Sequence, residues 1–197
     1  MTQDLIQRDK ILRQEADDLL GSKDLRGLLE EYGIPHITGS YALQLMTWRD
    51  LDIYLEQQEL SEELFFRLGG KIASRLAPIK MSFRNERIAQ TPNLPSGLYW
   101  GVYLGNERKD AWKLDIWAID SQECKQRLSF TERLIAELTS SRRRKILFIK
   151  EACWQDSGYR KTYTSQDIYC AVIEEGIENI DGFKQYMKDK GVSVGQN

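Results

Sequence analysis

The sequence predicts an α+β protein, with a small mixed β-sheet and its helices followed by a helical C-terminal part. Two observations predict this class. Runs of alternating apolar and polar residues occupy the middle of the chain, and only helical spacing of apolar residues follows Asp120. With 197 residues, 41% of them hydrophobic and 29% charged, the chain can bury a globular core. We expect N-terminal helices at 1–33, a sheet-containing core at 34–120 and a helical region at 121–197.

Helices are predicted from apolar spacing and from capping residues. One spans residues 3–20 and is ended by Gly21, and a second is capped by Ser22 and ended by Gly33. Ser61 is a suitable N-cap for a later helix. These later helices are expected at residues 40–47, 61–76, 121–139, 142–155, 165–175 and 181–190.

Strands are predicted between these helices. They are expected at residues 34–38, 50–56, 79–88, 98–104 and 111–119. The last two runs flank the polar segment "GNERKD" and therefore predict a β-hairpin with a long turn.

Composition excludes several classes of protein. The net charge of −2 gives no strong global field, so nonspecific binding to nucleic acid is not expected. The three cysteines and the single histidine match no zinc spacing or disulfide framework. The N-terminus is charged throughout and no run approaches the ~20 apolar residues of a membrane span. We expect a cytoplasmic protein with no membrane partner.

Two carboxylates interrupt the apolar strand at 50–56. Strand side chains alternate, so Asp50 and Asp52 share one face and lie about 7 Å apart, while Leu51 and Ile53 share the other face. Carboxylates this close raise each other's pKa unless a cation neutralises them. Mg²⁺ commonly takes one or two carboxylates together with substrate phosphates, so a magnesium site is one interpretation. An exposed edge strand with solvated acids is the other.

A third carboxylate, Asp115, interrupts the strand at 111–119. If this strand lies beside 50–56, three carboxylates converge and can hold two metal ions, an arrangement suited to in-line phosphoryl or nucleotidyl displacement. Asp115 would then take the proton from an attacking hydroxyl.

Gly39 and Ser40 follow the strand at 34–38 and open a short helix. Glycine allows close approach of the backbone to a ligand, and the N–H groups of a helix N-terminus suit a phosphate. Ordinary capping of the helix by Ser40 is the alternative interpretation.

Taken together, the pattern resembles the DNA-polymerase-β-like nucleotidyltransferase superfamily, including its small bacterial antibiotic and minimal members. The matching residues are the pair Gly39-Ser40, nine intervening residues, Asp50 and Asp52 with apolar flanks, and Asp115 on a later strand. The resemblance covers about 34–119. It implies a nucleotidyltransferase core with a mixed-sheet palm, two Mg²⁺ ions on the three aspartates, and a triphosphate gripped by Gly39-Ser40.

The reaction that the resemblance implies moves a nucleoside monophosphate from an NTP such as ATP to a hydroxyl, with release of pyrophosphate. We expect a small, antibiotic-like acceptor; a protein acceptor of antitoxin type is the alternative. One departure supports a further alternative, a non-catalytic protein of this fold. Residues 41–48, "YALQLMTW", are bulky where many relatives carry a small Gly- and Ser-rich stretch with basic residues.

Basic residues near the motif have two readings each. Arg49 and Lys113 are expected to contact the triphosphate, or else to balance nearby acids. The basic run at 142–145 suggests RNA binding only weakly, because such runs are more often solvated helix faces. The C-terminal helices are expected to form an acceptor pocket or an oligomer interface.

Overall fold

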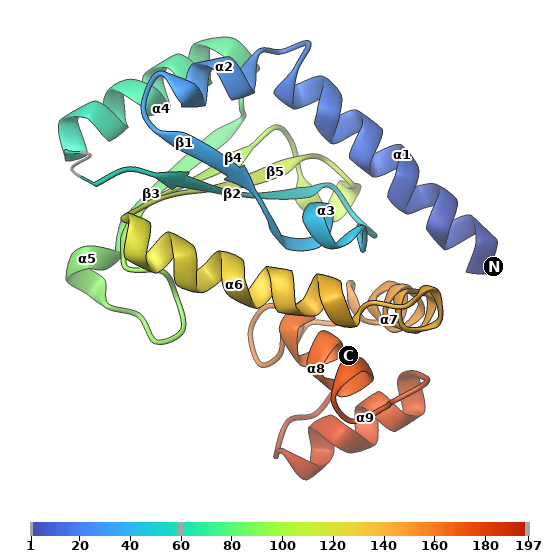
Figure 1. Cartoon of the computed structure of the whole chain (residues 1–197). Helices are drawn as coiled ribbons and strands as arrows, with labels where there is room; N and C mark the ends of the chain where they lie inside the picture. Colours follow the sequence, from blue (N-terminus) through green and yellow to red (C-terminus); the bar gives the residue numbers. More distant parts are fainter. Residues whose placement is uncertain (1, 59–60, 196–197) are drawn as a thin grey trace.

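The computed structural model describes residues 2–58 and 61–195 (Figure 1). Within these ranges the chain forms a mixed five-stranded sheet in the order β1-β2-β5-β4-β3, with helices on both faces and a helical C-terminal part. The strands are β1 (Ile34–Ile37), β2 (Asp50–Glu56), β3 (Lys80–Asn85), β4 (Gly97–Tyr103) and β5 (Lys113–Ile119). The helices are α1 (Thr2–Leu20), α2 (Leu25–Glu30), α3 (Gly39–Leu43), α4 (Glu62–Leu76), α5 (Glu86–Ala89), α6 (Ser121–Glu137), α7 (Ser140–Cys153), α8 (Ser165–Ile173) and α9 (Ile180–Asp189), with a 3₁₀ turn η1 (Glu107–Lys109). The predicted α+β class is confirmed.

Strands β2 and β5 form the centre of the sheet and run parallel, while the other neighbouring pairs are antiparallel. The β4–β5 pair is the hairpin predicted from the sequence, and η1 lies in its long turn. The parallel register sets Asp52 opposite Asp115 and Asp50 opposite Lys113. The acids predicted to converge are therefore direct neighbours across two strands.

The two faces of the sheet differ as the alternation predicts. One face is apolar and packs against α2 and α4, with Leu51, Ile53, Leu114 and Ile116 fully buried in the main core (Figure 1). The other face carries the aspartates and is covered by α6. Burial of the apolar face holds the sheet in place, so the polar face is free to carry a site.

A second hydrophobic cluster joins the C-terminal helices to the segment that connects α3 with β2. Leu43, Leu45 and Trp48 are buried among side chains of α6, α7, α8 and α9. The carbonyl of Leu45 accepts a hydrogen bond from Lys150 at 2.7 Å, and Arg143 donates to the carbonyl of Leu43. The bulk of Leu43, Leu45 and Trp48 is therefore explained by packing against the C-terminal helices.

Several boundaries differ from the sequence-based expectations, and the helix expected at 40–47 ends at Leu43. The second helix is not capped by Ser22, because Asp24 precedes its first residue in a left-handed conformation with φ of 49°. The strand expected at 79–88 ends at Asn85, whose side chain accepts from Arg87 N–H and starts the short α5. Among the described residues, no helix is long and apolar enough to cross a membrane.

Candidate active site

Three aspartates converge on the face of the sheet that α6 covers. One carboxylate oxygen from each of Asp50, Asp52 and Asp115 lies within 4.8 Å of the other two. The side chains of Asp50 and Asp115 are only 16% and 14% exposed. Such separations suit oxygen ligands around one or two shared divalent cations. The sequence-based expectation that these three residues meet is confirmed in position.

Burial and crowding shift the pKa values of these acids in different directions. Burial, together with the charges of Asp50 and Asp115, raises the pKa of Asp52 to about 7. The pKa of Asp115 is also raised by burial and by Asp50. Burial alone would raise the pKa of Asp50 too, but Arg160 and Lys113 outweigh it and hold this pKa low. The site therefore carries negative charge that the protein neutralises only in part.

Asp115 is held from both sides. Lys113 Nζ lies 2.7 Å from one oxygen of its carboxylate, and Tyr99 donates to the other oxygen at 2.5 Å. Tyr99 reaches it because Gly101, which is opposite Asp115 in β4, has no side chain; a Cβ there would lie 2.5 Å from the tyrosine hydroxyl. Lys113 thus lies in the site as expected, and Tyr99 is a site residue that sequence reasoning missed.

Gly39 lies directly against Asp52. Its φ is +59°, and a Cβ built on it would be 2.0 Å from the nearer carboxylate oxygen of Asp52. Only glycine combines that conformation with that approach. Ser40 follows in the first turn of α3 and is half-buried. Gly39 and Asp52, thirteen residues apart in the sequence, are therefore direct neighbours in the fold.

Arg49 does not point to the aspartates. Its guanidinium binds both carboxylate oxygens of Glu15 at 2.7 and 2.8 Å and also Asp110 at 2.5 Å. It links α1 to the turn before β5, so the alternative reading, in which Arg49 balances nearby acids, describes its position in this structure.

Arg160 provides a cation that the sequence did not reveal. It lies in the loop between α7 and α8, with one guanidinium nitrogen 3.2 Å from Asp50 Oδ2 and another 2.9 Å from Glu107. The second oxygen of Asp50, Oδ1, is buried and has no hydrogen-bond partner among the described residues. A buried carboxylate oxygen without a partner fits a metal ligand, because leaving it unsatisfied is costly.

Lys150, on α7, is fully buried behind the site. It donates to the carbonyl of Leu45 and to the Tyr169 hydroxyl, and its Nζ lies 4.6 Å from the centre of the Trp48 ring. Burial lowers its pKa from 10.5 to about 7, against the attraction of Asp50 and Asp52. No local sequence pattern identifies this residue, because only tertiary packing brings α7 to the segment between α3 and β2.

Stability should therefore depend on pH through Lys150. Above about pH 7 the folded protein holds Lys150 neutral, while the unfolded chain keeps it protonated, so stability rises with pH. Between pH 7 and 9 we expect a rise of about 2 kcal/mol that Lys150→Met lacks. Urea unfolding of both proteins at pH 7, 8 and 9 measures it. Equal pH slopes in the two proteins would contradict the expectation.

The basic run at 142–145 is largely occupied within the protein. Arg142 binds Glu137 and the carbonyl of Ile173, and Lys145 binds Glu178. Arg143 donates to two carbonyls at the end of α3. These contacts make the run a structural element of the C-terminal helices, which weakens its reading as an RNA-binding patch.

The sheet order and its covering helices give this chain a fold that it shares with solved polymerase and terminal-transferase structures. Among solved structures, the chain is similar to the Cid1 poly(U) polymerase with Mg and 3′-dATP bound, at a TM-score of 0.55 and 13% identity over 83% of this chain. It is also similar to a cytoplasmic RNA terminal U-transferase, at a TM-score of 0.56 and 11% identity over 89% of this chain. The chain spans 49% and 55% of those two proteins. No family model and no curated protein matches the sequence.

Proposed function

We propose that this chain is a metal-dependent nucleotidyltransferase that moves a nucleoside monophosphate from an NTP to a hydroxyl group and releases pyrophosphate. The observation that carries the proposal is the convergence of Asp50, Asp52 and Asp115 within 4.8 Å, with Gly39 packed against Asp52. Three like charges on one buried face are unfavourable without a cation, so a protein that merely needed this fold would gain nothing from keeping them.

The three aspartates would hold two Mg²⁺ ions, and the unpartnered Oδ1 of Asp50 is the atom best suited to a new ligand. When bound, the metals neutralise charge on the attacked phosphate and on the leaving pyrophosphate. Gly39 and Ser40 offer backbone N–H groups and a hydroxyl to the triphosphate. Lys113 lies against Asp115 and can bind a phosphate oxygen once it leaves that carboxylate.

Asp115 is the proposed general base for the acceptor hydroxyl. Its pKa is raised by burial and by Asp50, which favours uptake of a proton. Tyr99 and Lys113 orient its carboxylate through one hydrogen bond to each oxygen. Each of these oxygens keeps a second lone pair that can accept the proton of the acceptor hydroxyl.

A small molecule is the proposed acceptor class. The net charge of −2 and the internal pairing of Arg142 and Lys145 give no support to a nucleic-acid backbone as the acceptor. A protein acceptor is the alternative. An assay with a radiolabelled NTP, offered antibiotic-like amino alcohols, protein fractions and an RNA oligonucleotide, separates these classes.

The first test is calorimetric titration with ATP, GTP, CTP and UTP, each with and without Mg²⁺. We expect one NTP to bind only with Mg²⁺. In a transfer assay Asp115→Asn should lower kcat by about 100-fold or more, because a general base contributes that much. Asp18→Asn, the same chemical change at an exposed position on α1, is the matched control and should act like wild type. Failure of every triphosphate to bind would favour the non-catalytic alternative.

A further inference from the structure

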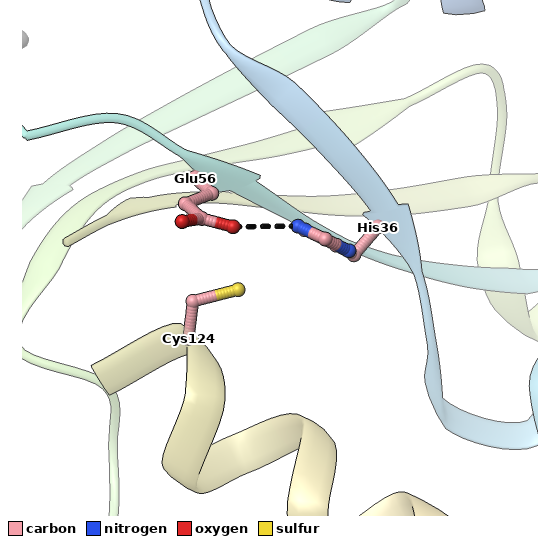
Figure 2. Close-up of side chains that lie close together, drawn as sticks. All are labelled: His36, Glu56 and Cys124. Atoms are coloured by element: carbon pink, nitrogen blue, oxygen red, sulfur yellow. Dashed lines mark hydrogen bonds and ion pairs between the residues drawn. The ribbon is translucent and has the colours of Figure 1, made fainter. Parts of the chain in front are cut away.

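A second group of metal-binding side chains lies at the far end of β2. His36 on β1, Glu56 on β2 and Cys124 on α6 each offer one ligand atom, and these three atoms lie within 4.8 Å of one another. Figure 2 shows the Cys124 side chain pointing from α6 toward Glu56, which is itself linked to His36. Glu56 is four residues beyond Asp52, or about 13 Å along the strand, so this group is separate from the aspartates.

We propose that His36, Glu56 and Cys124 bind one zinc ion. The donors are an imidazole nitrogen, a carboxylate oxygen and a thiolate sulfur, the three ligand types that Zn²⁺ takes in proteins. Thiolate and imidazole favour zinc over Mg²⁺, whereas the aspartates offer only oxygen. No spacing of cysteines and histidines in the sequence indicates this group, because its members lie far apart along the chain. They come together only when β1, β2 and α6 pack.

Binding of a zinc ion by these three residues would need only small side-chain movements. His36 Nε2 lies 2.9 Å from a carboxylate oxygen of Glu56. Bond lengths of about 2.0 to 2.3 Å in a tetrahedral site put neighbouring ligand atoms about 3.3 to 3.7 Å apart. The imidazole and carboxylate would therefore separate slightly, and the sulfur would approach within the 4.8 Å that already bounds the group.

The group of three ligand side chains is buried on one side and accessible to solvent on the other. Cys124 is fully buried, whereas the side chains of His36 and Glu56 are 28% and 25% exposed, so an ion can enter from the solvent side. A water molecule on that side would complete the four ligands. Because the ligands come from three elements, the ion would tie the edge of the sheet to the first turns of α6.

Cobalt titration tests the proposal, because a thiolate ligand gives Co²⁺ a charge-transfer absorption in the near ultraviolet that carboxylates do not give. The reduced, EDTA-treated protein is titrated with Co²⁺ in excess Mg²⁺, which occupies the oxygen-only site. We expect the thiolate band to saturate at one equivalent and to be abolished by Zn²⁺. At 100 times its Kd, Zn²⁺ should also raise Tm by about 5 to 10 °C.

Matched variants make the result specific. Cys124→Ala should lose the band, while Cys170→Ala, which removes the half-buried thiol of α8, should keep it. His36→Asn, at a partly exposed position, should weaken Co²⁺ binding by about tenfold or more and covers the case in which Cys124→Ala does not fold. A wild-type protein without the band, a band that survives in Cys124→Ala, or unchanged Co²⁺ affinity in His36→Asn would overturn the proposal. None of these readouts depends on nucleotidyl transfer.

Discussion

Asp52→Asn is expected to abolish nucleotidyl transfer and, in the absence of metal, to make the protein more stable. Loss of one of the carboxylates proposed to hold the metal ions should lower kcat by about 1,000-fold or more. The gain in stability follows from crowding, because Asp52 is surrounded by Asp50 and Asp115 in a buried position. Asparagine has nearly the same shape and carries no charge.

The sign of the pH dependence follows from the pKa of Asp52. This pKa is raised from 3.8 to about 7, so between these values the folded protein keeps a proton that the unfolded chain has lost. Stability of the wild type therefore falls as the pH rises from about 4 to 7. Asp52→Asn lacks this fall, and its advantage should reach up to about 4 kcal/mol at pH 8.

Urea unfolding in EDTA at pH 5 and pH 8 measures this difference. Asp52 acts on the pKa of Lys150, so the comparison is made also in a Lys150→Met background, where this contribution to the pH dependence is absent. Asp50→Asn is the matched variant, since Asp50 attracts Arg160 and Lys113; its replacement should not stabilise the protein. Mg²⁺ should raise the Tm of the wild type and leave Asp52→Asn unchanged. A less stable Asp52→Asn at pH 8 in EDTA would contradict the crowding argument.

Gly39→Ala is expected to have the second large effect. Alanine disfavours the φ of +59°, and its Cβ would meet the carboxylate of Asp52, so the backbone and the acid have to move apart. We expect a loss of about 1 to 3 kcal/mol in stability and about tenfold or greater weakening of Mg²⁺-dependent NTP binding.

Gly70→Ala on α4 is the matched control. A Cβ there meets no atom within 4 Å, and alanine is the better helix former, so stability should hold or rise by about 0.5 to 1 kcal/mol. Thermal unfolding and NTP titration of both variants give the comparison. Wild-type NTP affinity in Gly39→Ala would show that contact between Gly39 and Asp52 does not shape the nucleotide site.

Much of the fold could be predicted because strand alternation is a local signal. The run at 50–56 predicted both its strand and the face that Asp50 and Asp52 share. Arg49 lies in the bend just before β2, outside the alternation, and two readings of its role stayed open in the sequence. Its pairing with Glu15 fits the reading in which it balances a nearby acid.

The other site residues could be predicted from local sequence patterns only in part, or not at all. Gly101 interrupts an aromatic strand and is the signal that could have identified Tyr99, since strand glycines mark close approach. Arg160 lies in a loop and Lys150 on a helix with no motif around it. Their approach to Asp50 depends on how the C-terminal helices pack, which no periodicity in the sequence encodes.

The packing of Leu43, Leu45 and Trp48 among the C-terminal helices also limits how this protein can be recombined. In a chimera that takes the helices after Asp120 from another protein, these three side chains would pack against different residues. Trp48 donates a hydrogen bond to Asp50, so the mismatch would spread to the aspartates. An exchange of the C-terminal helices should therefore include residues 41–48 if the aspartates are to keep their arrangement.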